Sequence, residues 1–144
     1  MRVLILCTGN SCRSQMAAGF LGSFDRRIEV HSAGTYPASY VQPLAIEVMR
    51  EAGVDISRSV PKSVDQFVAQ PFDYVVTVCD DANETCPVFS GAVGRRLHMG
   101  FHDPSFAPGS NEQKLAEFRS VRDQIRAAFA SLYRAEILPD LIAD

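Results

Sequence analysis

Short apolar runs alternate with amphipathic stretches along the chain, and the first such pair opens it. Residues 3–6 (VLIL) form a continuous apolar run, which is typical of a strand covered on both faces of a sheet. In the segment that follows, SCRSQMAAGFLGSF, the apolar residues from Met16 to Phe24 have helical spacing. The pattern therefore predicts a strand, a loop and a helix at this end of the chain.

The pairing of strand and helix recurs further along the chain. Residues 28–32 alternate between apolar and polar and predict a second strand. A helix from about Val41 is predicted to end at Gly53, because glycine suits a C-terminal cap. The segment FDYVVTVC at 72–79 is rich in β-branched and aromatic residues and predicts the clearest strand, and residues 96–99 predict a weaker one.

The remaining segments predict a short helix, a loop and a long final helix. The short helix is expected near 63–69, and two prolines and a glycine in HDPSFAPGS at 102–110 indicate a loop. Ser110 and Gln113 have the spacing of a capping box, which starts the last helix. The predicted buried face of that helix carries Leu115, Phe118, Ile125, Phe129 and Leu132.

Strands that alternate with amphipathic helices predict an α/β fold. We expect a single-domain four-stranded parallel sheet with helices on both faces, formed by residues 1–144 as one domain. Ligands of such sheets bind beyond the carboxyl ends of the strands. Cys7 and Cys79 each close a predicted strand, so these two cysteines are expected to share one site.

Composition narrows the possible ligands. Hydrophobic residues make up 47% of the 144-residue chain and charged residues 22%, which is typical of a globular domain. The formal net charge of -3 and the lack of a basic block argue against nucleic acid and anionic membranes as partners. Because the apolar run at 3–6 is too short for a signal peptide, we expect a cytoplasmic protein with a small ligand.

Four cysteines allow three interpretations: disulfides, a zinc site or catalytic thiols. Two structural disulfides would suit a small secreted protein, but no export signal is visible. The spacings of five residues from Cys7 to Cys12 and of seven from Cys79 to Cys86 differ from those of common zinc knuckles. Reactive thiols in a reducing compartment are the favoured interpretation.

The segment CTGNSCRS at 7–14 links the first strand to the first helix and predicts an anion site. Its backbone N–H groups and the helix N-terminus would surround an oxyanion, and Gly9 is expected to supply a positive φ for this nest. The planar guanidinium of Arg13 can bind two oxygens of a tetrahedral anion. The predicted oxyanion-binding residues are Thr8, Gly9, Asn10, Ser11, Cys12, Arg13 and Ser14.

Cys7 stands at the mouth of this loop and is the predicted nucleophile. The helix dipole and Arg13 should lower the pKa of its thiol, and Ser14 can donate a hydrogen bond to the sulfur. The alternative is a small core residue at a strand end with a solvated arginine beyond it. Strand, glycine, serine and helix in this order favour the chemical interpretation.

CTGNSCRS resembles the signature of the low-molecular-weight tyrosine phosphatase fold. Most of the remaining chain is similar to the thioredoxin-coupled arsenate reductase branch of that fold. The segments that carry this similarity are SAGTYP, PLAIEVMREAGVDIS, VVTVCDDANETCP, HDPS and FRSVRDQI.

The resemblance implies a reaction in which arsenate is reduced to arsenite. Cys7 attacks arsenate with Asp103 as general acid, Cys79 then attacks Cys7, and Cys86 resolves the Cys7–Cys79 bridge. Thioredoxin would reduce the resulting Cys79–Cys86 disulfide, although a glutaredoxin couple stays open as the donor. A monomer without an organic cofactor is implied. Some relatives hold a potassium ion with a carboxylate at the position of Ala18, which has no ligand atom, so we expect no metal.

A disulfide between Cys79 and Cys86 constrains the segment between them. A regular helix would separate their Cα atoms by roughly 10 Å, whereas a disulfide needs about 4.4 to 6.8 Å. We therefore expect residues 80–85 to be partly helical when reduced and to loop out on oxidation.

Two further residues and two other functions stay open. Cys12 is expected to be structural, with a protective disulfide to Cys7 as the alternative, and His102 to be either solvated or a neighbour that tunes Asp103. The second function is a phosphatase for phosphate monoesters, in which the two distal cysteines are incidental. A non-enzymatic oxyanion or redox sensor is the third.

Overall fold

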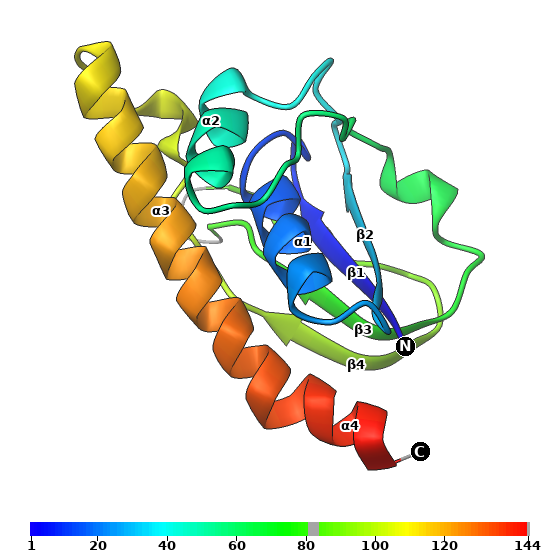
Figure 1. The fold of residues 1–144 in the computed structure, drawn as a ribbon. Helices are drawn as coiled ribbons and strands as arrows, with labels where there is room; N and C mark the ends of the chain where they lie inside the picture. Colours follow the sequence, from blue (N-terminus) through cyan, green and yellow to red (C-terminus); the bar gives the residue numbers. More distant parts are fainter. Residues whose placement is uncertain (81–83, 144) are drawn as a thin grey trace.

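A computed structural model of the chain describes residues 1–80 and 84–143. It contains a four-stranded parallel sheet with the strand order β2-β1-β3-β4 (Figure 1). The strands are β1 (Arg2–Cys7), β2 (Glu29–Gly34), β3 (Phe72–Thr77) and β4 (Val93–His98). The predicted fold class, a single α/β domain with four parallel strands, is confirmed.

The strand register aligns the carboxyl ends of all four strands. Cys7 pairs with Gly34, Leu6 with Thr77, and Thr77 with His98. Cys79 follows β3 by two residues, because the strand ends at Thr77 rather than at Cys79 as predicted. Both cysteines nevertheless lie at the same edge of the sheet, as the sequence predicts.

Three α-helices pack together beside the sheet. They are α1 (Arg13–Phe24), α2 (Pro43–Glu51) and α3 (Asn111–Leu132), which continues through the π-helical turn η3 (Tyr133–Ile137) into α4 (Leu138–Ala143). Figure 1 shows α1 in front of the sheet and α3 running along the length of the molecule. The capping box at Ser110 and Gln113 is present, and Gly53 has φ +84° just beyond α2, so both predicted helix ends are confirmed.

The two faces of the sheet are covered differently. Val3 and Ile5 of β1 belong to a large core formed with α1, α2 and α3. Leu4 and Leu6 point to the other face and pack in a smaller cluster with Phe67 of the 3-10 region around η1 (Val64–Gln66). The predicted helices on both faces are thus divided unequally, with the α-helices on one face and a 3-10 turn on the other.

The sequence predicts a strand at 96–99, whereas β4 spans Val93–His98. The prediction misses its first residues because Gly94 and Arg95 give no apolar signal there. Gly94, Arg95 and Arg96 are exposed on β4, which is the last strand on its side of the sheet.

Among residues 1–80 and 84–143, none of the helices has the length and apolar character of a membrane span.

Candidate active site

A cavity of about 560 Å³ opens at the carboxyl edge of the sheet. The loop from Cys7 to Arg13 forms its floor, and Gln42, Glu84 and Asp103 contribute to its walls. The side chains of Cys7 and Arg13 come from the end of β1 and the start of α1, and both are buried. The cavity therefore contains the predicted nucleophile and the predicted anion-binding arginine together.

The tight turn of the loop is made by Asn10 rather than Gly9. Asn10 has φ +51°, whereas Gly9 is not among the residues with positive φ, so the prediction for Gly9 is wrong. An asparagine tolerates this conformation when its side chain is bonded locally. Asn10 Nδ2 donates to Ser14 Oγ at 2.8 Å and its Oδ1 accepts from the Lys62 N–H at 2.9 Å. A bond from Ser14 to the Cys7 sulfur stays a prediction.

A second loop orients the peptide groups of the first. The carbonyls of Thr8 and Gly9 accept hydrogen bonds from the N–H groups of Tyr36 and Ala38, at 3.0 and 2.9 Å. Since C=O and N–H point in opposite directions in a trans peptide, the N–H groups that follow these carbonyls face away from the second loop. Gly34 permits this approach, because a Cβ there would collide with the Thr8 carbonyl oxygen.

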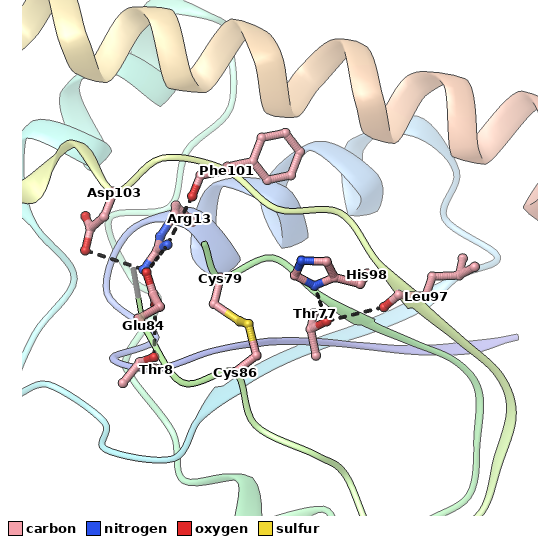
Figure 2. Close-up of a disulfide and its surroundings, with 10 residues drawn as sticks. All are labelled: Thr8, Arg13, Thr77, Cys79, Glu84, Cys86, Leu97, His98, Phe101 and Asp103. Atoms are coloured by element: carbon pink, nitrogen blue, oxygen red, sulfur yellow. Dashed lines mark hydrogen bonds and ion pairs between the residues drawn. A yellow bond between two sulfur atoms is a disulfide. The ribbon is translucent and has the colours of Figure 1, made fainter. Parts of the chain in front are cut away.

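The Arg13 guanidinium lies between two carboxylates (Figure 2). Its Nη1 and Nη2 donate to Oε2 and Oε1 of Glu84 at 2.7 and 2.9 Å. Nη1 also donates to the Phe101 carbonyl at 3.1 Å, and Nη2 to Asp103 Oδ2 at 3.4 Å. Thr8 Oγ1 donates to Glu84 Oε1 at 3.0 Å, so the carboxylate of Glu84 contacts the anion loop twice.

The two carboxylate oxygens of Asp103 have different partners: Oδ1 is bonded within its own turn, and Oδ2 faces Arg13. It caps the 3-10 turn η2 (Pro104–Phe106), where its Oδ1 accepts from the Ser105 N–H at 2.9 Å and from Ser105 Oγ at 2.5 Å. Gln42 Nε2 donates to the same hydroxyl at 2.5 Å. These contacts orient Oδ2 toward Arg13 at the wall of the cavity.

Cys79 and Cys86 form a disulfide, whereas Cys7 and Cys12 are free thiols. The Cα atoms of Cys79 and Cys86 are 5.8 Å apart, which is within the range of a disulfide and shorter than the roughly 10 Å that seven residues of a regular helix would span. The Glu84 N–H donates to the Asp80 carbonyl at 2.9 Å, which is one helix-like bond. Residues 81–83, on which the predicted reduced helix also depends, lie outside the described ranges.

The prediction of a lowered pKa for the Cys7 thiol is wrong for the state with the Cys79–Cys86 disulfide. Burial raises the pKa of its thiol, and this effect outweighs the lowering by Arg13 and by the Thr8 backbone. The charges of Glu84 and Asp103 raise that pKa further. The pKa of Cys12 is also raised, mainly by burial, which agrees with a structural residue.

Glu84 is ionised in spite of partial burial. Burial by itself raises the pKa of its carboxyl, but the hydrogen bonds and charge of Arg13, together with hydrogen bonds from Thr8 and the Asp80 backbone, make the net shift downward. The carboxylate therefore presents a full negative charge to Arg13 at neutral pH.

The structure brings Cys7, Arg13 and Asp103 into one cavity. Cys79 and Cys86 do not line it, but Asp80 and Glu84, which lie between them in the chain, do. Sequence reasoning missed Glu84, which is 71 residues from Arg13 along the chain. One signal for it was available: an acidic residue two positions before the second cysteine of the pair.

Family comparison agrees with this site. Residues 2–140 match the family described as low molecular weight phosphotyrosine protein phosphatase. The chain belongs to this family. It is 45% identical over 127 residues to an arsenate reductase of Halalkalibacterium halodurans, covering 85% of this chain and 88% of the relative. It is 43% identical over 124 residues to the arsenate reductase of Bacillus subtilis, with the same coverage.

Solved arsenate reductases share the fold. An arsenate reductase in the phosphate binding state has a TM-score of 0.75 at 31% identity, over 91% of this chain and 95% of that one. The thioredoxin-dependent arsenate reductase of Corynebacterium glutamicum has a TM-score of 0.69 at 28% identity, over 96% of this chain and 62% of that one. The predicted family resemblance is confirmed.

Proposed function

We propose that this protein reduces arsenate to arsenite, with Cys7 as nucleophile and the Cys79–Cys86 pair as the source of two electrons. The observation that carries the proposal is a disulfide whose intervening residues Asp80 and Glu84 line the cavity that holds the free thiol of Cys7. Hydrolysis of a phosphate ester needs one thiolate and water, whereas reduction of arsenate needs two thiols to be oxidised. Relatives at 45% and 43% identity are named arsenate reductases, which supports the same reaction here.

In the first step the Cys7 thiolate attacks arsenic and forms a sulfur–arsenic bond. The hydroxyl group that leaves arsenic takes a proton from Asp103 and departs as water. Arg13 and the N–H groups of the anion loop bind the remaining oxygens and stabilise the charge that builds on them.

In the second step the Cys79 thiolate attacks the Cys7 sulfur. The electron pair of the sulfur–arsenic bond passes to arsenic, which leaves as arsenite, and a Cys7–Cys79 disulfide forms. Cys86 then attacks the Cys79 sulfur and releases the Cys7 thiolate. The product is a Cys79–Cys86 disulfide with free Cys7, which is the bonding state of this structure.

A dithiol must then reduce the Cys79–Cys86 disulfide, and thioredoxin is the proposed donor. A neighbour of the same fold is a thioredoxin-dependent arsenate reductase, which supports this choice. The proposed location is the cytoplasm, because the cycle requires thiols that are kept reduced. The proposed form is a monomer.

Phosphate monoester hydrolysis is the second candidate activity at the same site. Phe106 is exposed at the wall of the cavity and could contact an aromatic leaving group. This activity would use Cys7, Arg13 and Asp103 without the distal cysteines.

Consumption of NADPH with thioredoxin and thioredoxin reductase measures the proposed reaction. The wild type should consume NADPH when arsenate is added, and Cys79→Ser should lose this activity while it still hydrolyses an aryl phosphate. Full arsenate turnover in Cys79→Ser, or none in the wild type, would contradict the proposal. The aryl phosphate assay controls for an intact anion site.

A further inference from the structure

Glu84 occupies the anion-binding face of Arg13 in the disulfide state. The four N–H groups at Nη1 and Nη2 of Arg13 match four observed acceptor contacts: two oxygens of Glu84, the Phe101 carbonyl and Asp103. A tetrahedral oxyanion can therefore bind both terminal nitrogens of Arg13 only if the Glu84 carboxylate leaves.

The carboxylate fills this site incompletely. Arg13 Nε is buried and has no hydrogen-bond partner among the described residues. A carboxylate has two oxygens, whereas arsenate or phosphate has four and could bind Nη1, Nη2 and the loop while also reaching Nε. The donors at this site therefore fit a larger anion than the one now bound.

The charges in the cavity also oppose an incoming anion. Glu84 places a negative charge against the single positive charge of Arg13, and Asp103 adds a second carboxyl group beside it. Because Arg13 is buried, these charges interact more strongly than exposed ones would. Arsenate and phosphate are themselves anionic at neutral pH and would be repelled while Glu84 stays in place.

The position of Glu84 is linked to the disulfide by a short piece of chain. Glu84 precedes Cys86 by two residues, and Cys86 is bonded to Cys79, which follows β3 by two residues. The Cα atoms of the two cysteines are 5.8 Å apart, whereas a regular helix over the same span would require roughly 10 Å. When the bond is reduced, this restraint on Glu84 is removed.

We propose that Glu84 is an internal competitor for the oxyanion, which holds Arg13 in the disulfide state and releases it when Cys79 and Cys86 are reduced. This inference rests on the proposed function only in taking the oxyanion as substrate. The oxidised protein would then bind arsenate weakly at a stage when it has no thiols left to reduce it.

Calorimetric titration with inorganic phosphate, which thiols do not reduce, tests the proposal without turnover. Oxidised wild type should bind phosphate about tenfold more weakly than reduced wild type, the low end of what a charge-assisted hydrogen bond is worth. Glu84→Gln should remove most of this difference by strengthening binding in the oxidised form alone. Glu84→Asp, which keeps the charge on a shorter side chain, should fall between. Glu117→Gln on the exposed face of α3 is the matched control and should behave as wild type.

Equal phosphate affinity of oxidised and reduced wild type would overturn the proposal. An equal gain from Glu84→Gln in both redox states would overturn its link to the disulfide. Arsenate turnover is scored separately: phosphate binding that follows the predicted pattern in a protein without arsenate reduction would reject the proposed function and keep Glu84 as competitor.

Phosphate binding and the redox state of Cys79 and Cys86 must affect each other equally, so the reduction potential gives a second measurement. If reduced protein binds phosphate tenfold more tightly, saturating phosphate must favour the dithiol tenfold over the disulfide. This shift equals about 30 mV for a two-electron couple and is measured by equilibration in glutathione redox buffers. Glu84→Gln should abolish most of the shift, whereas a wild-type potential that does not respond to phosphate would contradict the coupling.

Discussion

The anion loop at 7–14 and the disulfide segment at 79–86 meet at one cavity but are held in opposite ways. The loop is fixed by hydrogen bonds from a second loop and by the side chain of Asn10, which is fully buried. The disulfide segment is held to the site by a covalent bond and by the ion pair of Glu84 with Arg13. The anion loop is therefore fixed by hydrogen bonds, whereas the disulfide segment is restrained by the Cys79–Cys86 bond, which the proposed reaction forms and breaks.

This difference separates the two chemistries of the family. Binding an oxyanion and attacking it require only the fixed loop and Asp103, which is sufficient for a phosphatase. Reduction also requires a second sulfur to reach the first, so part of the site has to change position. Glu84 belongs to the disulfide segment and is bonded to Arg13 of the anion loop. Through this contact the redox state of Cys79 and Cys86 would affect anion binding.

Loss of the nucleophile is the largest expected effect, because both chemistries share it. Cys7→Ser should reduce arsenate turnover and aryl phosphate hydrolysis by about 10⁴-fold or more. Both assays should be run on the same preparation, together with a circular dichroism spectrum. Retention of either activity would mean that the fixed loop does not supply the nucleophile for that reaction.

Replacement of Arg13 tests the fixed loop as an anion site. Arg13→Lys keeps the charge but cannot bind two oxygens in the planar geometry, so turnover should fall by about 10²- to 10³-fold. Steady-state kinetics with arsenate measure the effect. A loss of less than about threefold would show that charge alone is sufficient at this position.

The conformation of the loop itself is tested at Asn10. Asn10→Ala should lower the free energy of unfolding by about 2 to 4 kcal/mol, because it removes buried hydrogen bonds and leaves a residue with φ above zero. Asn10→Gly removes the same bonds without the backbone strain and should cost about 1 kcal/mol less. Urea denaturation of both variants separates the two effects, and equal costs would contradict the role of the left-handed backbone.

The pH dependence of Cys7 alkylation is the smallest expected effect. Since the pKa of this thiol is raised by burial in the disulfide state, its thiolate forms at higher pH than that of an ordinary cysteine. Alkylation by iodoacetamide should rise with pH to an inflection above that of the unfolded protein. In Glu84→Gln the inflection should move to lower pH, because the Glu84 charge contributes to the upward shift. An unchanged inflection would show that Glu84 does not affect Cys7.

Local patterns predicted the parts of the molecule that depend on local chemistry. The apolar runs at 3–6 and 72–79 identified the two central strands, because parallel strands are buried on both faces. The segment 7–14 contains most of the anion site in eight consecutive residues. The types and spacing of these residues were therefore sufficient to predict the site.

The remaining features depend on contacts between distant segments. Either Gly9 or Asn10 could supply the positive φ, and the choice follows from the bond of Asn10 to Lys62 in another loop. The thiol of Cys7 was expected to be acidic because of Arg13, but the depth of burial that reverses the shift is a tertiary property. Glu84 lies 71 residues from Arg13 along the chain, so their contact depends on the tertiary fold.

A single turnover of Cys86→Ser with arsenate tests most directly whether electrons pass from Cys79 to Cys7. Without the resolving thiol, the reaction should stop after one arsenite per protein and leave a Cys7–Cys79 disulfide, which peptide mass spectrometry detects. Continued turnover, or arsenite release without a peptide that links Cys7 to Cys79, would contradict the proposed cascade.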